Sequence, residues 1–270
     1  MNPMLKSLRK YGFIYTLFIK NSLMSQMEYR VNFLMGLLVE TSYLFAKFLY
    51  VIIVYEAGLT LDGVPIDAIL LFIGTYTLMT GLYWGLFAIN FVQIPEHVRT
   101  GSLDILLTKP ISLQFMMTLR NVDFGLAIPN VLGGVTMVVV GWRRLGLPVD
   151  VASISGFIFF LVLGLFVTYT LFLIPQLLSF WFIQIAAVND ISNGLFELNN
   201  MPMSIYSKWI QRIGIFVIPV LLITNFSPLF VLDRLHQGLF LWAILAPVLL
   251  LGITRWIWSK AIRNYNSSGG

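Results

Sequence analysis

Few residues in this sequence could carry out covalent chemistry, and their types and spacing match no common catalytic motif. The chain contains no cysteine, so thiol catalysis, thiolate metal sites and disulfides are excluded. The sequence also lacks the G-x-x-x-x-G-K-[ST] loop of many ATPases, the H-E-x-x-H zinc motif and the G-x-S-x-G motif of serine hydrolases. Its two histidines predict no metal site, because the topology derived below places His97 and His236 on opposite sides of a membrane. We therefore expect a chain without catalytic residues, a metal or a cofactor.

The segment from residue 95 to residue 110 is better suited to a mechanical role. Gly101 can end the preceding helix, and Ser102 is a favourable N-cap for a new, short helix. Asp104 in the first turn and Lys109 in the last turn would complement the dipole of this helix, and a proline then closes the element. The segment therefore predicts a two-turn helix between two longer ones.

The short helix carries one apolar stripe, because Leu103, Leu106 and Leu107 fall at positions i, i+3 and i+4. A helix of two turns cannot bury such a stripe by itself. The stripe would therefore either lie on the lipid surface or dock into a groove of a soluble partner.

Glu40 lies in the middle of an apolar run and could be a functional carboxyl group. A charged side chain at the centre of a bilayer costs roughly 2.5–3.5 kcal/mol, so we expect Glu40 to face protein, water or a partner. It is either a buried structural carboxyl group or part of a transport route. Lys47 lies two turns further on, too far for a direct bridge, and its ammonium can extend outward to the membrane surface.

A second group of polar residues precedes a proline-rich stretch: Asp190, Asn193, Glu197, Asn199 and Asn200. If this segment crosses the membrane, its polar face must line a subunit interface or a transport route. If it is a loop, these residues are merely solvated.

Composition indicates that lipid is the solvent for most of the chain. Apolar residues make up 58% of the 270 residues and charged residues only 11%, with a mean hydropathy of +0.86. Average soluble domains are about 45–50% apolar and about 25% charged. This excludes a soluble enzyme, a disordered tail and a nucleic-acid-binding protein.

Five apolar runs are long enough to cross a membrane, and the region between the fourth and fifth supplies one more crossing. The runs are Val31–Tyr55, Ile66–Ile94, Phe124–Val140 with a helix that starts near Phe115, Ile154–Ile183 and Leu239–Trp258. We therefore expect an all-α protein with six transmembrane helices in one domain over residues 31–260. Residues 4–28, within an N-terminal segment 1–30, alternate apolar and charged side chains and predict a helix lying in the membrane interface. Residues 261–270 would form a short tail.

Basic residues gather before the first run, between the second and third runs and near the C-terminus, whereas only acids follow the first run. The basic residues are Lys6, Arg9, Lys10, Lys20, Arg30, Arg99, Lys109, Arg120, Arg255, Lys260 and Arg263, and the acids are Glu56, Asp62 and Asp67. This pattern predicts that both termini are cytoplasmic. Arg143 and Arg144, which follow the third run, do not fit. Since topology explains the positive charge, no nucleic-acid partner is needed.

Residues 184–235 allow two interpretations. In the first, residues 184–212 are cytoplasmic and Ile213–Leu232 crosses outward, so that Lys208 and Arg212 obey the charge rule. In the second, residues 184–203 form a polar fifth span, and residues 204–232 form a hairpin that dips back from the outer face. Hydropathy favours the first interpretation.

Several stretches of the sequence, in this order and spacing, resemble one family. Residues 101–110, Gly-Ser-Leu-Asp-Ile-Leu-Leu-Thr-Lys-Pro, resemble the coupling helix of type-2 ABC export permeases, and in particular a bacterial six-span branch with separately encoded ATPases. Residues 26–33 resemble the start of the first span of that branch. Residues 180–182, 206–209 and 263–265, together with Pro202 and Pro219, resemble its later half.

The resemblance implies a permease subunit of an ATP-driven exporter in the bacterial cytoplasmic membrane. It would form half of the translocation route with a second permease, identical or homologous, and with two ABC ATPase subunits that hold ATP and Mg. The family's hairpin before the last span favours the second interpretation of residues 204–232. The Gly81–Gly85 pair could then mark a contact between the two permeases.

The candidate ATPase-coupling residues are Glu96, Arg99, Gly101, Ser102, Leu103, Asp104, Leu106, Leu107, Lys109 and Pro110. The candidates for the route or for the permease interface are Glu40, Glu197, Asn199 and Asn200. The alternative function is a secondary transporter or channel without an ATPase partner. That function would need ion-coupling groups inside the membrane, and only Glu40 is a strong candidate.

Overall fold

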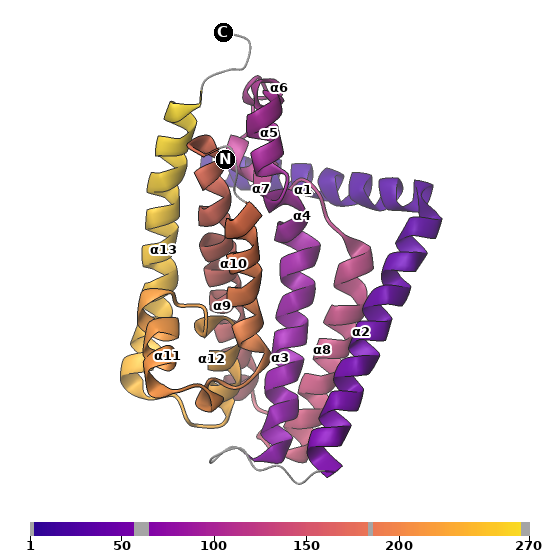
Figure 1. Cartoon of the computed structure of the whole chain (residues 1–270), viewed down its shortest axis with the longest axis vertical. Helices are drawn as coiled ribbons and strands as arrows, with labels where there is room; N and C mark the ends of the chain where they lie inside the picture. Colours follow the sequence, from indigo (N-terminus) through magenta and orange to yellow (C-terminus); the bar gives the residue numbers. More distant parts are fainter. Residues whose placement is uncertain (1–2, 57–64, 183–185, 266–270) are drawn as a thin grey trace.

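The computed structural model describes residues 3–56, 65–182 and 186–265, and these residues are helical, with no strand among them (Figure 1). Five helices are long and apolar enough to cross a membrane, or six if one bent pair counts as a span. The expected all-α, multi-pass fold is confirmed. Asp62, the start of the predicted fifth span at residue 184 and the end of the tail lie outside the described residues.

The long helices match the apolar runs, because in lipid only a helix satisfies every backbone group within one segment. They are α2 (Arg30–Glu56), α3 (Ile66–Tyr83), α8 (Phe124–Arg144), α9 (Val151–Leu177) and α13 (Gln237–Asn264). The expectation that the α8 helix starts near Phe115 is wrong. A separate short helix, α7 (Leu113–Leu119), precedes it, and the Asp123 side chain caps α8 by accepting a 3.1 Å hydrogen bond from the Leu126 backbone.

Helix α3 is the centre of the bundle, with most of its apolar stretch buried among α8, α9 and α12 (Leu222–Val231). It continues through a π-helical turn, Trp84–Ala88, into α4 (Ile89–Phe91) and α5 (Ile94–Thr100). Helix α2 packs on the outer side of α8, and no residue of its apolar stretch is fully buried (Figure 1).

The close approach of α3 and α8 depends on small residues. A Cβ atom on Gly85 would lie 2.6 Å from the Cβ of Ala127, and one on Gly81 would lie 2.9 Å from Val131. Real side chains do not come so close, so only glycine fits at these positions. The Gly81–Gly85 pair thus joins two helices of the same chain. This corrects the expectation that it contacts a second permease.

Helix α1 (Pro3–Glu28) lies across one end of the bundle (Figure 1). Leu5, Leu8 and Phe13 are exposed on it, as expected for a helix in the membrane interface. Hydrogen bonds fasten it to the segment that connects α6 (Leu103–Leu107) to α7. The Lys10 ammonium donates to the carbonyl of Pro110 (2.9 Å), and the backbone of Ser112 donates to the hydroxyl of Tyr11 (3.0 Å).

The region that allowed two interpretations contains α10 (Ala186–Glu197), a 3-10 turn Leu198–Asn200 and α11 (Lys208–Arg212) before α12. Helix α11 continues as a π-helical turn to Val217 and is bent by 106° relative to α12. Figure 1 shows α10 running away from the α1 end, and α11 and α12 lying near the opposite end. The bent pair is either one broken span, as in the first interpretation, or a re-entrant hairpin, as in the second, and α10 is not among the helices long and apolar enough to cross a membrane.

Candidate functional site

The predicted coupling segment forms an elbow between α5 and α6. Gly101 ends α5 in the left-handed conformation, with φ of 71°, which glycine adopts without steric cost. The expectation that the Ser102 side chain caps α6 is wrong. Its hydroxyl forms a 2.8 Å hydrogen bond with Nδ1 of His97 and accepts a 3.1 Å hydrogen bond from Thr100. These bonds tie the start of α6 to the last turn of α5.

The apolar stripe of α6 is mostly buried in the protein itself. Leu103 and Leu106 are 0% and 6% exposed and belong to the same hydrophobic cluster as Met117 of α7 and Trp258 of α13. The expectation that this stripe lies on lipid or docks into a soluble partner is therefore wrong for Leu103 and Leu106, because other helices of the same chain bury them. Leu107 (46% exposed) and Ile105 (64% exposed) remain on the surface.

The polar residues of the segment lie around this exposed surface. Glu96 and Arg99 form an ion pair of 2.7 Å on α5, and both side chains are more than half exposed. Lys109 is exposed at the end of the segment, and Pro110 is exposed beside α1, whose Lys10 binds its carbonyl. Buried leucines thus anchor the elbow, and charged and apolar side chains lie on its exposed surface.

The C-terminal end of α13 joins the elbow, which the sequence analysis did not anticipate. Asp104 interacts with Tyr265, and burial, reinforced by this carboxylate, raises the pKa of the Tyr265 phenol. The Asn264 amide donates a 3.0 Å hydrogen bond to the carbonyl of Phe180 at the end of α9. The sequence Arg263-Asn264-Tyr265 is a signal that the end of α13 has a role, but its spacing does not indicate that it contacts the elbow.

A second polar group lies between the spans. Asn130 of α8 is 2% exposed, and its Nδ2 donates a 2.7 Å hydrogen bond to Oε2 of Glu40 on α2. Glu40 also borders a cavity of about 500 Å³ that includes Gln26 and Asp123 at the junction of α1, α2 and α8. The carboxyl group therefore faces protein and a cavity, as expected. Its partner Asn130 was missed, although a lone amide within an apolar run is a signal for such a contact.

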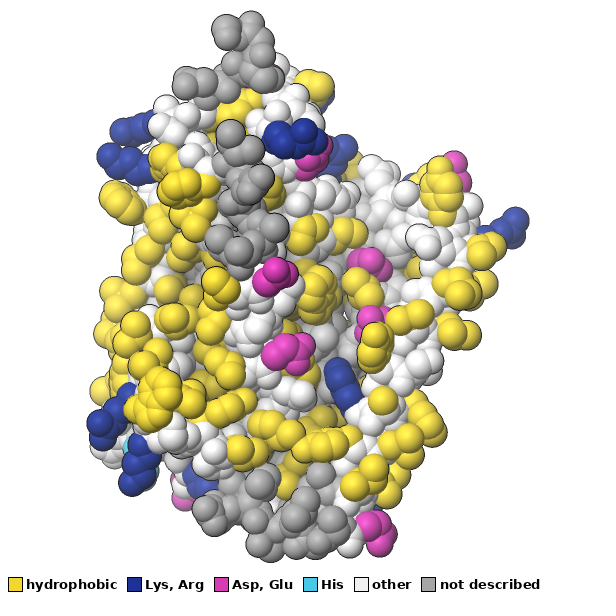
Figure 2. Space-filling model, viewed as in Figure 1, with side chains coloured by type: hydrophobic (Ala, Val, Ile, Leu, Met, Phe, Trp, Pro, Cys, Tyr) yellow, Lys and Arg dark blue, Asp and Glu magenta, His cyan; other side chains and the backbone are white. Residues whose placement is uncertain are grey.

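Lys47 connects the two sets of predicted polar residues. Its ammonium lies 5.1 Å from the centre of the Tyr76 ring and interacts electrostatically with both Glu40 and Glu197. The Glu197 carboxylate also interacts with the Tyr76 hydroxyl. The expectation that Lys47 extends outward to the membrane surface is wrong. On the face seen in Figure 2, acidic side chains and a basic one lie near one another within a surface that is otherwise mostly hydrophobic or uncharged.

The neighbouring asparagines serve the packing of the polypeptide. Asn199 is buried, accepts a 3.0 Å hydrogen bond from the Thr224 hydroxyl of α12, and donates to the carbonyl of Phe196. Asn200 is half-buried. Glu197 is exposed and interacts with Tyr76, whereas Asn199 fixes the end of α10 against α12.

Among the described residues, no three His, Cys, Asp or Glu side chains come together in a group that could hold a metal ion. The two polar groups described above can instead bind a protein surface, move with the helices, or contact a solute through charge and hydrogen bonds.

Comparison with known proteins identifies the family. The family described as ABC-2 family transporter protein matches residues 41–269, which includes α5, α6 and every span after α2. No curated protein and no solved structure matches significantly. The match covers far more than half of the chain and agrees with the multi-pass helical fold. The chain is therefore a membrane protein of the ABC-2 transporter family.

Proposed function

We propose that this chain is the permease subunit of an ATP-driven exporter in the bacterial cytoplasmic membrane. It forms half of the translocation route with a second permease, identical or homologous. Two separate ABC ATPase subunits bind ATP and Mg and dock on the elbow of α5 and α6. The chain itself catalyses no reaction and holds no cofactor. Besides the family, the observation that carries this proposal is the construction of the elbow.

The elbow is suited to transmit force. Leu103 and Leu106 anchor α6 in the core, so a push on the exposed Ile105 and Leu107 moves α6 together with its surroundings. Helix α5 continues from the central span α3 through α4, and α3 packs along α8 and α12. A displacement at the elbow therefore reaches α3, α8 and α12 as a rigid-body shift.

Charge supports a cytoplasmic location for the elbow. The basic residues of α1, of residues 99–120 and of the last turns of α13 lie at the end that carries the elbow. Exceptions lie at the other end: Lys208 and Arg212 of α11, and Arg143 and Arg144 at the end of α8. Of these, Arg144 is 3.8 Å from the Asp67 carboxylate and lies over the Tyr55 ring. Partial neutralisation reduces the weight of this exception in the positive-inside rule.

Residues 204–232 are proposed to form a re-entrant hairpin on the outer side. Two features support it: the 106° bend between the two helical arms, and the burial of residues 222–228 of α12. Non-helical backbone at membrane depth is tolerated only where protein shields it, and here α3 and α9 provide the shield.

Glu40, Lys47 and Glu197, with Asn199 and Asn200 behind them, are proposed to line the route or the interface with the second permease. A charged group that faces lipid is costly. Helix α2, which carries Glu40 and Lys47, has no fully buried residue in its apolar stretch, so the rest of the chain does not cover these side chains completely. A water-filled route or a second permease removes that cost.

The test is affinity purification of the tagged chain from its native membranes, with ABC ATPases identified by mass spectrometry. We expect an ABC ATPase with the wild type and a loss of roughly tenfold or more with Ile105→Asp, because burying one unpaired charge in a protein interface costs several kcal/mol. Val149→Asp, at an exposed apolar residue of the opposite end, is the matched control and should retain the ATPase. Absence of any ABC ATPase from the wild-type sample would instead support a secondary transporter or channel.

A further inference from the structure

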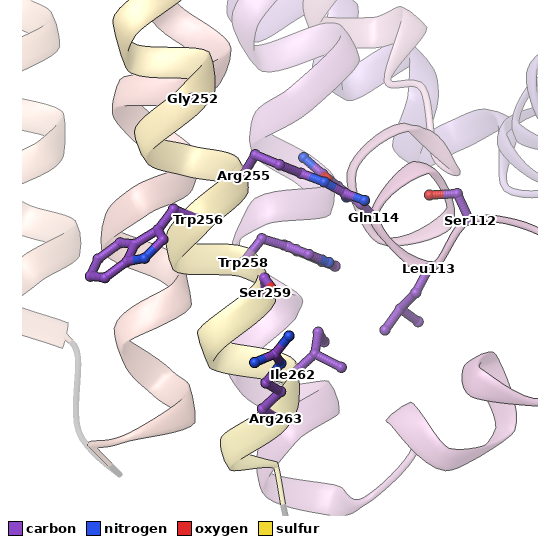
Figure 3. A pocket seen from close by; sticks show the side chains of 10 residues that line it. All are labelled: Ser112, Leu113, Gln114, Gly252, Arg255, Trp256, Trp258, Ser259, Ile262 and Arg263. Carbon is purple, nitrogen blue, oxygen red and sulfur yellow. The ribbon is translucent and has the colours of Figure 1, made fainter.

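A cleft of about 650 Å³ separates the last third of α13 from the start of α7 (Figure 3). Arg255, Ser259 and Arg263 line it from α13, and Ser112 and Gln114 line it from the opposite side. The three α13 residues are spaced by four and therefore share one face of the helix. The cleft is separate from the exposed side chains of α6 and from the group around Lys47.

The charge of the cleft is positive. No acidic residue lines it, and among the described residues neither guanidinium has a carboxylate within ion-pair distance. Arg255 donates one hydrogen bond of 3.1 Å to the side-chain oxygen of Gln114, which holds it across the cleft and leaves its other N–H groups available. Figure 3 shows the Arg255 side chain extending toward Gln114 and the Arg263 guanidinium nearer the C-terminal end of α13.

The cleft lies at the level of the membrane interface. Arg255 is the first charged residue of α13, after an apolar stretch that begins at Leu239. Helix α1, which exposes apolar side chains across this end of the bundle, is hydrogen-bonded to Ser112 at the rim of the cleft. Trp256 borders the cleft and is 63% exposed, as tryptophan is at the boundary between headgroups and acyl chains.

We propose that this cleft binds the phosphate headgroup of an anionic phospholipid from the leaflet that contains α1. The planar guanidinium groups of Arg255 and Arg263 can each donate two parallel hydrogen bonds to phosphate oxygens. The hydroxyl groups of Ser112 and Ser259 supply further donors. A basic pocket between helices at this depth is suited to an anionic headgroup.

The consequence is structural. A lipid in this position contacts α7 and α13 together, and α7 follows directly on α6. The lipid therefore holds the elbow against the last span, and its loss would loosen that contact.

The experiment measures lipid binding by native mass spectrometry and thermal stability for the purified full-length chain in detergent, with added phosphatidylglycerol, phosphatidylcholine or inorganic phosphate. We expect selective binding of phosphatidylglycerol and a rise in melting temperature. We expect Arg255→Gln/Arg263→Gln to weaken the binding roughly tenfold or more, since both substitutions remove charge-assisted hydrogen bonds to the phosphate. Lys260→Gln removes the same charge from the same helix outside the cleft, and should bind as the wild type does.

Arg263→Gln alone keeps the test valid if the double variant does not fold, because Arg263 is exposed and makes no ion pair that its loss would break. Equal phosphatidylglycerol binding by the cleft variants and by Lys260→Gln would overturn the proposal. Equal stabilisation by inorganic phosphate would show a site for free anions rather than lipid. Unchanged lipid binding together with loss of a co-purified protein would assign the cleft to a protein partner.

Discussion

Asn130 of α8 donates a 2.7 Å hydrogen bond to the Glu40 carboxylate of α2, across the contact that holds the outermost span to the bundle. The same Asn130 amide also donates to the carbonyl of Leu126, 3.0 Å away in its own helix. Only one oxygen of Glu40 is needed for this contact. The other is left to face the cavity between α1, α2 and α8.

Replacement of Glu40 by Gln should leave the fold intact and change transport. The glutamine oxygen can accept the same hydrogen bond from Asn130, so we expect the free energy of unfolding to change by no more than about 1 kcal/mol. We expect normal assembly with the partners and lower substrate-stimulated ATP turnover of the reconstituted complex. Unchanged stimulated turnover together with unchanged export would reduce Glu40 to a packing residue.

Gln26 should control how α1 is held against the bundle. Its amide donates a 2.6 Å hydrogen bond to the carbonyl of Val122 and accepts one of 3.1 Å from the backbone of Phe124. Gln26→Ala removes both, and we expect a loss of about 1–2 kcal/mol and faster hydrogen exchange in α1. Asn21→Ala, an exposed amide of the same helix, is the control. Equal exchange in the two variants would contradict the prediction.

Periodicity and apolar length were sufficient to predict the long helices, the existence of helix α1 and the end of α5 at Gly101. The failures concern interactions between distant segments. Ser102 has the residue type of an N-cap, but its hydroxyl binds His97 instead. Leu106 belongs to an amphipathic stripe, yet the stripe cannot indicate that other helices of the same chain bury it. The length and spacing of the apolar segments do not indicate which distant segments contact each other.

For the polar residues too, the sequence did not indicate which distant segments they contact. Hydropathy alone favoured a loop for residues 184–212, because α10 carries charged and amide side chains. The structure gives these groups partners on other helices, with Lys47 near Glu197 and Thr224 bound to Asn199. Polar residues that find partners within the bundle lower the hydropathy of a segment, so hydropathy alone does not show which segments pack against it.

The contact between α3 and α8 should not tolerate a methyl group. In Gly85→Ala the new Cβ would lie 2.6 Å from the Cβ of Ala127, so the helices must move apart, and overpacking of this kind costs about 1–3 kcal/mol. Gly12→Ala, in α1 with open space around it, should be neutral or stabilising, because alanine favours helix. The measurement is the melting temperature of the purified chain. A Gly85→Ala protein as stable as Gly12→Ala would refute the close contact.

The group around Lys47 allows a test that needs neither partner nor substrate. Lys47→Met leaves Glu197 and Glu40 without the cation that interacts with both, so we expect the melting temperature to fall by a few degrees, or about 1 kcal/mol. Adding Glu197→Gln to this variant removes one of the unpaired acids and should restore part of the loss. The two changes would then be non-additive, as expected for side chains in one interacting group.

The matched control combines Lys47→Met with Glu96→Gln, because Glu96 is an acid paired only with Arg99 at the distant elbow. This second double variant should show the sum of its single effects. Additive behaviour of Lys47→Met and Glu197→Gln would mean that α2 and α10 do not interact through these charges. The proposal that Glu40, Lys47 and Glu197 form one polar surface for the route or the permease interface would then lose its basis.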